Sequence, residues 1–401
     1  MKKKIDPVVD EAIERLNMKD GPPRRKLLEG AGLFSATAAA SALIAACSSS
    51  STSSASSAAT SASASATAAA AGSFPSTPKW QFWFVNHVYT NTFFVPTQYG
   101  FADAAALLDI PTPKWGGSAS TSSVAQMVSF LQTAVAAKAN GIATTVINST
   151  GFTTPVMDAM NAGIPVVTYN ADGTVNSSGV ADIGTNRLCY VGQALYLSGQ
   201  QLGERIKSLV TTPGEIVIFI ATPGTGNIQP RYDGAASVLK AAGYTVSEIA
   251  TGSSTSVELA AEKAYLLGHK GVKGVFAVDA GSTSFIPQAV AGAGLPASTP
   301  TGGFDLTPTT LSAIQAGTLD FTINQNPYLQ GFLPTLYLYM FNLSGGLVPP
   351  PDTDTGLSFV TKTTVDPYLA SASRFEGSTT AQKVIPLPSG AIQNPIATTS
   401  T

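Results

Sequence analysis

The chain has 401 residues, of which 44% are hydrophobic and only 11% are charged, so it can form more than one domain and bury a large core. Its formal net charge is −2, which argues against nucleic acid as a partner because phosphate binding needs a basic face. The two cysteines, Cys47 and Cys189, lie in dissimilar surroundings, and there are only two histidines. We therefore expect no disulfide bond, no structural metal site and no cofactor.

Residues 1–46 have the pattern of an export signal. Arg24-Arg25-Lys26-Leu27-Leu28 is a twin-arginine pattern, and the weakly apolar run that follows is too short to remain in a membrane. The run ends in Ile44-Ala45-Ala46-Cys47, which resembles a bacterial lipobox. An ordinary alanine-rich helix with a chance cysteine is the alternative, but the order of the three features disfavours it. The resemblance to a twin-arginine lipoprotein signal implies export and lipidation of Cys47, with the protein in the periplasm or on the outer face of the cytoplasmic membrane.

Residues 47–76 form a linker that is almost wholly serine, alanine and threonine from Ser48 to Gly72. Such a segment cannot bury enough apolar surface to offset its ordering entropy, so we expect a flexible tether. At the other end, 387–401 is expected to be a loose tail.

From Trp80 onward, strand-like runs alternate with amphipathic helical patterns. The expected strands are Gln81–Val88, Thr144–Asn148, Pro165–Asn170, Glu215–Ala221, Thr245–Ile249, Val275–Asp279, Pro300–Phe304 and Phe321–Asn324. The expected helices are Val124–Asn140, Thr154–Asn161, Leu195–Leu209, Arg231–Ala241, Val257–Leu267, Phe285–Ala293, Pro308–Ala316 and Tyr328–Phe341. This alternation predicts an α/β protein with parallel sheets covered by helices on both faces. Two sheets with a break near 190–193 suit the length better than one large sheet.

An aromatic stretch, Trp80–Gly100, joins the first strand to the first helix. Its first half is aromatic and β-branched and reads as a buried strand, and Asn91 then lies where a strand-to-helix turn needs a cap. Adjacent Phe93 and Phe94 cannot both point into one core. At least one should be a first-turn core residue. Whether the other faces a cleft is left open, since ligands of open α/β sheets bind at the carboxyl ends of strands.

Polar side chains recur at the carboxyl ends of the expected strands. They are Asn91, Asn170, Asp172, Arg231, Asp279, Asp305 and Gln325. Each alone is explained as a helix N-cap or a helix start. Together at one sheet edge they would form a ring of hydrogen-bonding groups, which suits sugar hydroxyls because these both donate and accept.

Six segments in order carry a resemblance to a known family. They are Asn91-Thr92-Phe93-Phe94, Gly163-Ile164-Pro165-Val166-Val167, Arg231-Tyr232-Asp233-Gly234, Gly274-Val275-Phe276-Ala277-Val278-Asp279, Gly302-Gly303-Phe304-Asp305 and Ile323-Asn324-Gln325-Asn326-Pro327. From Trp80 to Gly346 the chain resembles the type I periplasmic sugar-binding proteins, the ribose-binding-protein family that serves ABC importers. The resemblance implies two Rossmann-like lobes joined by three crossings, here near Val191, Asn326 and Ser344. The lobes would be 77–190 with 327–345, and 191–326 with 346–386.

The same resemblance implies the ligand contacts. Asn91, Phe93 and Phe94 would come from the first lobe, and Arg231, Asp279, Asp305 and Gln325 from the second. For Asp279 it favours a ligand role over a capping role.

Ribose binders have an Asp-Arg pair where this chain has Asn170-Ala171 followed by Asp172, so ribose itself is in doubt. Trp115 either supplies a stacking face for the ligand or is a partly buried surface residue beside a glycine turn. We expect His87 to be a histidine with its hydrogen bonds satisfied near the cleft floor.

Other chemistry has weaker support. The loop 221–227 resembles a phosphate-binding loop but lacks the following Gly-Lys-Ser/Thr, and no Gly-x-Ser-x-Gly elbow is present. Asp279 and Asp305 as an acid/base pair for glycoside hydrolysis remain an alternative.

The resemblance implies instead a monomeric, non-enzymatic substrate-binding protein that delivers a neutral monosaccharide or polyol to an ABC permease, held at the membrane by its lipid. A sugar sensor that presents its closed form to a membrane receptor or chemoreceptor is the alternative. The same fold occurs in transcription repressors, but these need an N-terminal DNA-binding segment where this chain has an export signal.

Overall fold

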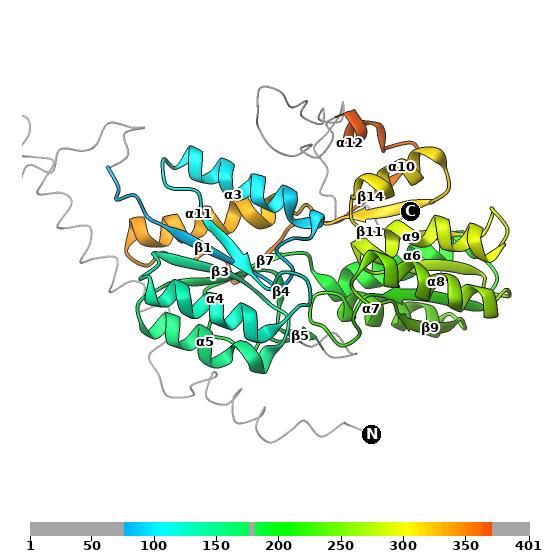
Figure 1. Ribbon diagram of the computed structural model, residues 1–401, viewed down its shortest axis with the longest axis horizontal. Helices are drawn as coiled ribbons and strands as arrows, with labels where there is room; N and C mark the ends of the chain where they lie inside the picture. The colour runs from blue at the N-terminus through cyan, green and yellow to red at the C-terminus, as the bar shows by residue number, and fades with distance from the viewer. Residues whose placement is uncertain (1–75, 176–180, 371–401) are drawn as a thin grey trace, which may run out of the picture. The chain divides into compact units, whose positions relative to one another are not determined.

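The computed structural model describes residues 76–175 and 181–370, which form two α/β lobes, each built on a six-stranded sheet (Figure 1). The expected export signal, Cys47, most of the linker and the 387–401 tail lie outside the described residues. No helix in the described ranges has the length and apolar character needed to cross a membrane.

The sheet of the first lobe is entirely parallel. Its strands, in spatial order, are β13 (Asp352–Asp354), β7 (Tyr190–Gly192), β4 (Val166–Asp172), β3 (Gly141–Val146), β1 (Phe82–Asn86) and β2 (Lys114–Gly117). Its helices are the 3₁₀-helix η1 (Thr92–Phe94), α3 (Val95–Leu107), α4 (Val124–Ala136), α5 (Ser149–Asn161) and α11 (Leu329–Ser344). A two-stranded ribbon, β5 (Thr174–Val175) with β6 (Ala181–Asp182), follows β4.

Side chains of β1 alternate between the two faces of this sheet, and both faces are buried. Phe82 and Phe84 pack in one apolar cluster with Phe101 of α3 and Leu338 of α11. Trp83 and Val85 pack in another cluster with residues of α4 and α5. A strand buried on both faces explains why this segment is an unbroken apolar run in the sequence.

The second lobe has five parallel strands and one antiparallel edge strand. In spatial order they are β14 (Ser358–Thr361), β12 (Phe321–Asn324), β11 (Thr301–Phe304), β10 (Gly274–Ala277), β8 (Glu215–Ile220) and β9 (Thr245–Ala250). Apolar residues of α6 (Leu195–Leu209) and α7 (Gln229–Ala241) cover one face. The other face is covered by α8 (Thr255–Gly268), α9 (Ala280–Ala293), α10 (Pro308–Ala316) and α12 (Asp366–Ala370).

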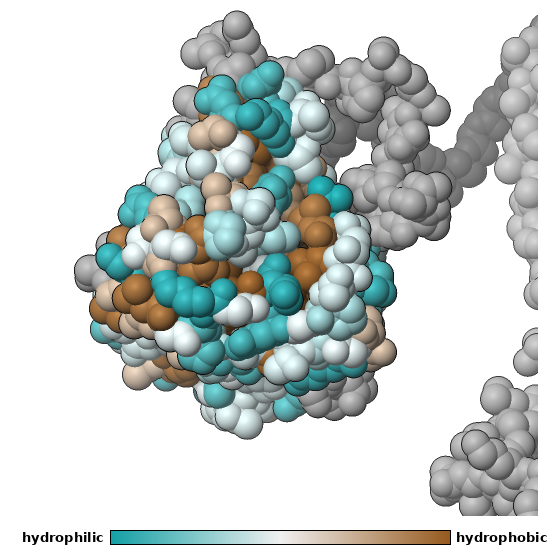
Figure 2. Space-filling model, turned by 90° about the vertical axis from the view of Figure 1, so that its right-hand side faces the viewer, coloured by the Kyte–Doolittle hydropathy of each residue, from teal (hydrophilic) through white to brown (hydrophobic). Residues whose placement is uncertain are grey.

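The outer surface of the molecule is chemically mixed. The face in Figure 2 carries hydrophilic and hydrophobic residues side by side. Two of the large exposed apolar side chains are Val257 and Leu267, both on α8. Such a mixture is usual, because folded proteins do not have enough polar surface to cover themselves completely.

Within the described residues, three segments connect the lobes: 193–194 between β7 and α6, 325–328 between β12 and α11, and 355–357 between β13 and β14. They are hydrogen-bonded to one another. Thr355 Oγ1 donates to the Gln325 carbonyl at 2.7 Å, and Gln193 Nε2 donates to the Gly356 carbonyl at 3.2 Å. The crossings therefore form one bonded unit between the sheets.

The third crossing lies about one strand later than the sequence suggested. We expected it near Ser344, but Ser344 ends α11, and the chain then returns to the first sheet, where β13 pairs with β7. Residues 352–354 belong to the first lobe, not the second. The reason is that Asp352-Thr353-Asp354 is an edge strand held by backbone hydrogen bonds, and it has no apolar side chain that would mark it in the sequence.

Candidate functional site

A cavity of about 620 Å³ lies between the lobes at the carboxyl ends of β1, β8 and β10. The first lobe contributes residues that follow β1, among them His87, Asn91 and Thr92. The second lobe contributes Asn227 and Asp279 together with the first turns of α9 and α10. Ligands of open α/β sheets bind at this edge, so the cavity is the candidate binding site.

Asn91 and the two phenylalanines behind it have different surroundings. Asn91 caps η1 by accepting a hydrogen bond from the Phe93 backbone N–H at 2.9 Å, and it also lines the cavity. Phe94 is 2% exposed and belongs to the core of the first lobe. Phe93 is half-buried, and its ring meets Phe94 edge-on with 4.7 Å between ring centroids.

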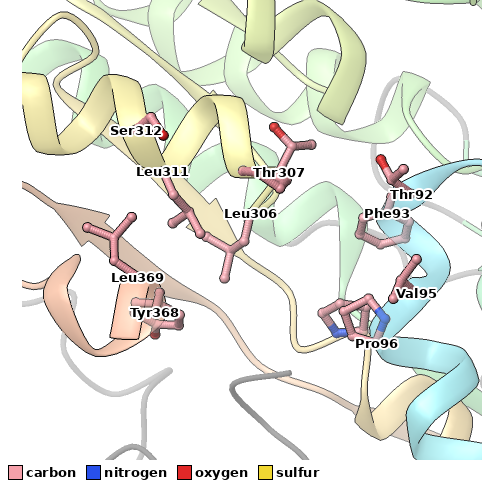
Figure 3. Close-up of a pocket in the computed structure, with 12 residues that line it drawn as sticks. Thr92, Phe93, Val95, Pro96, Leu306, Thr307, Leu311, Ser312, Tyr368 and Leu369 are labelled. Atoms are coloured by element: carbon pink, nitrogen blue, oxygen red, sulfur yellow. The ribbon is translucent and has the colours of Figure 1, made fainter. Parts of the chain in front are cut away.

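Phe93 lines a second, mostly apolar pocket of about 370 Å³ beside the main cavity (Figure 3). In that view Phe93 and Val95 lie across the pocket from Leu311 and Leu369 of the second lobe. The two hollows share three wall residues: Thr92, Thr307 and Pro308. An apolar pocket that opens beside a polar cavity has room for the C–H face of a ligand or for an apolar substituent.

Asp279 lies at the end of β10 and caps α9. Its carboxylate accepts hydrogen bonds from the backbone N–H groups of Ser282 at 2.9 Å and Ala221 at 2.8 Å, and from the Ser282 hydroxyl at 3.1 Å. The residue is 8% exposed and lines the cavity. Burial raises the pKa of its carboxyl, and these hydrogen bonds lower it. Asp279 thus has the capping role that we expected to be secondary, at a position that also borders the cavity.

Four other expected contacts are buried near the crossings and do not line the cavity: Asn170, Arg231, Asp305 and Gln325. Gln325 Nε2 donates to Asp305 Oδ1 at 2.6 Å. Gln330 Nε2 donates to Gln325 Oε1 at 3.2 Å, and Asn170 Nδ2 donates to Gln330 Oε1 at 3.0 Å. This polar chain joins β4 of the first lobe to the end of β11 in the second. Gln330 was not expected, because it lies in the first turn of a helix that reads as apolar.

Arg231 is next to the same chain of residues. It is 2% exposed, donates from Nη1 to the Val278 carbonyl at 3.0 Å, and places its guanidinium 4.3 Å from the centroid of the Phe304 ring. Burial lowers its pKa, and the Asp305 charge opposes that change. Burial also raises the pKa of Asp305 to about 6, against the opposing effect of Arg231. The two charges thus influence each other inside the second lobe, while Arg231 donates its hydrogen bond to the Val278 carbonyl and Asp305 accepts from Gln325.

Asp172 and Trp115 also lie away from the main cavity. Asp172 pairs with Arg187, whose Nε is 2.9 Å from Oδ1, and it lines a separate cavity of about 350 Å³. Arg187 thus supplies a guanidinium to this carboxylate from elsewhere in the chain. Trp115 is part of β2, packs on Phe94 and Phe101, and donates its indole N–H to the Tyr89 carbonyl at 2.9 Å.

His87 is 6% exposed, lines the cavity, and has both ring nitrogens hydrogen-bonded. Nδ1 is 3.2 Å from Thr145 Oγ1 and Nε2 is 3.2 Å from Nδ2 of Asn227. Burial lowers the His87 pKa to about 4, so the ring is neutral at pH 7. Nε2 then accepts from Asn227, and Nδ1 donates to Thr145. The sequence analysis did not name Asn227 as a site residue, although Asn227 ends the loop 221–227 that resembles a phosphate-binding loop.

Two lobes, three hydrogen-bonded crossings and a polar cavity between the lobes define a solute-binding protein that holds its ligand between two domains. The family model for the periplasmic binding protein domain matches residues 82–341. The chain belongs to this family, whose members are extracytoplasmic, non-enzymatic solute-binding proteins.

Known proteins similar to this chain include one characterised relative and many solved structures. The chain is 47% identical over 318 residues to the xylose/arabinose-binding protein XylF of Sulfolobus acidocaldarius, covering 78% of each chain. A solute-binding protein from Burkholderia graminis in complex with D-arabinose matches 72% of this chain and 98% of its own, with 21% identity and a TM-score of 0.64. A carbohydrate transporter from Acidothermus cellulolyticus in complex with myo-inositol matches 72% and 96%, with 24% identity and a TM-score of 0.62. At these identities the structures establish the fold.

Proposed function

We propose that this chain is the substrate-binding protein of an ABC importer and that it captures a neutral monosaccharide or polyol in the cavity between its lobes. The observation that carries the proposal is the cavity of about 620 Å³ with polar side chains from both lobes in its wall. The relationship to a xylose/arabinose-binding protein at 47% identity supports a pentose as the ligand.

The proposed ligand contacts come from both sides of the cavity. Asn91 and Thr92 offer an amide and a hydroxyl from the first lobe, and Asp279 offers its carboxylate edge from the second. Phe93 is proposed to cover the C–H face of the sugar where the apolar pocket joins the cavity. A ligand that touches both lobes stabilises the closed state by its higher affinity for that state.

The buried residues near the crossings have a different proposed role. Arg231, Asp305, Gln325 and Asn170 are at most 4% exposed and bind one another or the backbone. We propose that they hold the ends of β4, β11 and β12 in register at the crossings and shape the cavity floor. Rotation of the lobes brings them to the ligand only if this hydrogen-bonded chain rearranges.

We also propose that Cys47 is lipidated and that the following serine- and alanine-rich segment tethers a monomer to the outer face of the membrane. The twin-arginine pattern and the lipobox-like residues before Cys47 support this. The Cys47→Ala variant should be released from the membrane fraction into the soluble extracytoplasmic fraction when expressed in a bacterial host. Equal membrane retention of both proteins would contradict the lipid anchor.

A thermal-shift screen tests the binding proposal. Purified protein lacking residues 1–46 is heated with D-xylose, L-arabinose, D-arabinose, D-glucose and myo-inositol at millimolar concentration. A ligand that binds only the native state raises the melting temperature. At a ligand concentration of one hundred times Kd, the free energy of unfolding increases by about 2.7 kcal/mol. Calorimetry then measures the affinity, for which micromolar binding corresponds to about −8 kcal/mol. No shift with any pentose, hexose or polyol would contradict the proposal.

A further inference from the structure

Glu258, on α8, has a carboxyl group in the wall of the cavity. The residue is 4% exposed and is one of the cavity-lining side chains. Its carboxyl lies on the first turn of α9, where a Cβ added at Gly281 would be 2.1 Å from Glu258 Oε1. Glycine at position 281 therefore leaves the space that this carboxyl occupies. No hydrogen bond joins this carboxyl to any described group, a set that leaves out the side chains of residues 255 and 256.

The groups around Glu258 are acidic or neutral. Glu262, one helical turn further along α8, is fully buried, and neither of its carboxyl oxygens has a partner within the described residues. Asp279 faces both glutamates from the N-cap of α9, where its carboxylate accepts a hydrogen bond from the Ser282 backbone N–H. His87 faces the same cavity from the first lobe and is neutral. The Arg231 charge acts on Asp279, and neither glutamate forms an ion pair with a described basic side chain.

Three carboxyl groups this close together and this deeply buried cannot all carry a negative charge. Asp279 has hydrogen-bond donors that stabilise its anion, and the structure describes no such donor for either glutamate. Burial, and after it the Asp279 charge, raises the pKa of Glu258 to about 8 and that of Glu262 to about 10. Glu258 is therefore a protonated carboxylic acid at neutral pH, and its O–H group is a hydrogen-bond donor with no acceptor among the groups that the structure describes.

We propose that Glu258 is a further ligand-contacting residue of the cleft and that its neutral carboxyl group donates a hydrogen bond to a hydroxyl or ring oxygen of the bound sugar. The inference rests on the proposed function, since it names an additional contact for the same ligand. A neutral carboxylic acid can both donate and accept a hydrogen bond, whereas a carboxylate can only accept. The neutral acid can therefore donate to a sugar oxygen, which a carboxylate cannot do. Sugar binding is then linked to the proton on Glu258, and deprotonation weakens it.

Calorimetric titration with D-xylose, L-arabinose, D-arabinose, D-glucose and myo-inositol at pH 7.0, 8.0, 9.0 and 9.5 tests the inference. Asp305 and His87, with pKa values of about 6 and 4, do not titrate in this range. Linkage predicts that Kd of the wild-type protein rises by up to about tenfold for each pH unit above the pKa of Glu258. Glu258→Gln keeps a neutral donor that does not titrate, so its Kd should stay within about threefold of the wild-type value at pH 7 and should not change up to pH 9.0, below the pKa of about 10 of Glu262. Glu258→Ala should raise Kd at least tenfold at pH 7.

Glu204→Gln is the matched control, because Glu204 is an exposed glutamate on α6 of the same lobe. It should show the wild-type affinity and pH profile. Melting curves of each variant without sugar establish that it is folded. A Glu258→Gln protein with the wild-type pH profile, or a folded Glu258→Ala protein with wild-type affinity, would overturn the inference. Wild-type protein that binds no sugar at any pH would instead overturn the proposed function.

Discussion

Nε2 of His87 lies 3.2 Å from Nδ2 of Asn227, and this hydrogen bond connects the two lobes directly across the cavity. His87 follows β1 in the first lobe, and Asn227 precedes α7 in the second. The ring is also fixed by Thr145 and by an edge-on contact with Phe94, at 5.2 Å between centroids. One side of the contact is therefore rigid, and the contact favours the arrangement in which the lobes are close.

Asn227→Ala should weaken sugar binding. The substitution removes a hydrogen bond that exists only when the lobes are close, which is worth about 1 kcal/mol, so Kd should rise about fivefold in calorimetry. The melting temperature without sugar should change by no more than a few degrees. The same contact can be removed from its other side with His87→Ala. The matched control for that variant is His269→Ala, because His269 is an exposed histidine of the second lobe that stacks on Tyr265. Unchanged affinity in Asn227→Ala would contradict a role of this contact in closure.

The stability of the protein should depend on His87 at acidic pH. Its pKa in the folded state is about 4, below its ordinary value of 6.5, so the unfolded chain binds the proton more tightly. The stability that His87 contributes is present above pH 6.5 and is lost as the pH falls through 4. Asp305 has a raised pKa of about 6, so its contribution is present below its ordinary value of 3.8 and is lost as the pH rises through 6. The two effects oppose each other between pH 4 and 6.5.

A comparison of melting temperatures from pH 4 to 7 isolates the histidine. In His87→Gln the amide does not titrate, so the difference between wild type and variant should shrink as the pH falls from 6.5 to 4. A difference that stays constant over this range would show that His87 does not change its protonation on unfolding.

Asp279→Ala should both destabilise the protein and abolish sugar binding. The variant loses the N-cap of α9 and leaves the Ala221 amide without its acceptor, so the free energy of unfolding should fall by about 1–2 kcal/mol. Asp279→Asn keeps one acceptor oxygen for the Ser282 amide and should recover most of the stability. Urea unfolding and calorimetry measure the two properties separately.

Asn148→Ala is the control for this pair, because Asn148 caps α5 in the first lobe by accepting from the Gly151 amide at 2.8 Å and does not line the cavity. It should lose a similar amount of stability and keep full affinity. Wild-type affinity in Asp279→Ala would remove Asp279 from the proposed site.

Gln330→Ala should lower stability more than an exposed glutamine substitution. Gln330 is fully buried and bonds to Asn170, Gln325 and Thr355, so its removal leaves buried polar groups without partners. The expected loss is about 2–3 kcal/mol in urea unfolding, compared with less than about 0.5 kcal/mol for Gln126→Ala on the exposed face of α4. Equal denaturation midpoints would show that the polar chain at the crossings does not stabilise the lobes.

All eight strands expected from the sequence occur. The strands β1 and β8 are apolar runs buried on both faces, whereas β9 is an edge strand that is only partly buried. The strands that were not expected, among them β2, β7 and β13, are short or lie at an edge. Lys114-Trp115-Gly116-Gly117 and Asp352-Thr353-Asp354 have no apolar pattern, and their pairing partners alone make them strands.

The sequence by itself determined the class of fold and the approximate positions of these eight strands, since hydrophobic periodicity depends on local spacing. The tertiary structure decided which of the expected site residues reach the cavity. Asn91 and Asp279 line it, whereas Arg231, Asp305 and Gln325 turn into a buried chain that ends at Asn170 and Gln330. The direction of a side chain at a strand end depends on burial and on partners from distant segments. Glu258 belongs to the cavity wall only because α8 packs on the glycine at position 281 of α9.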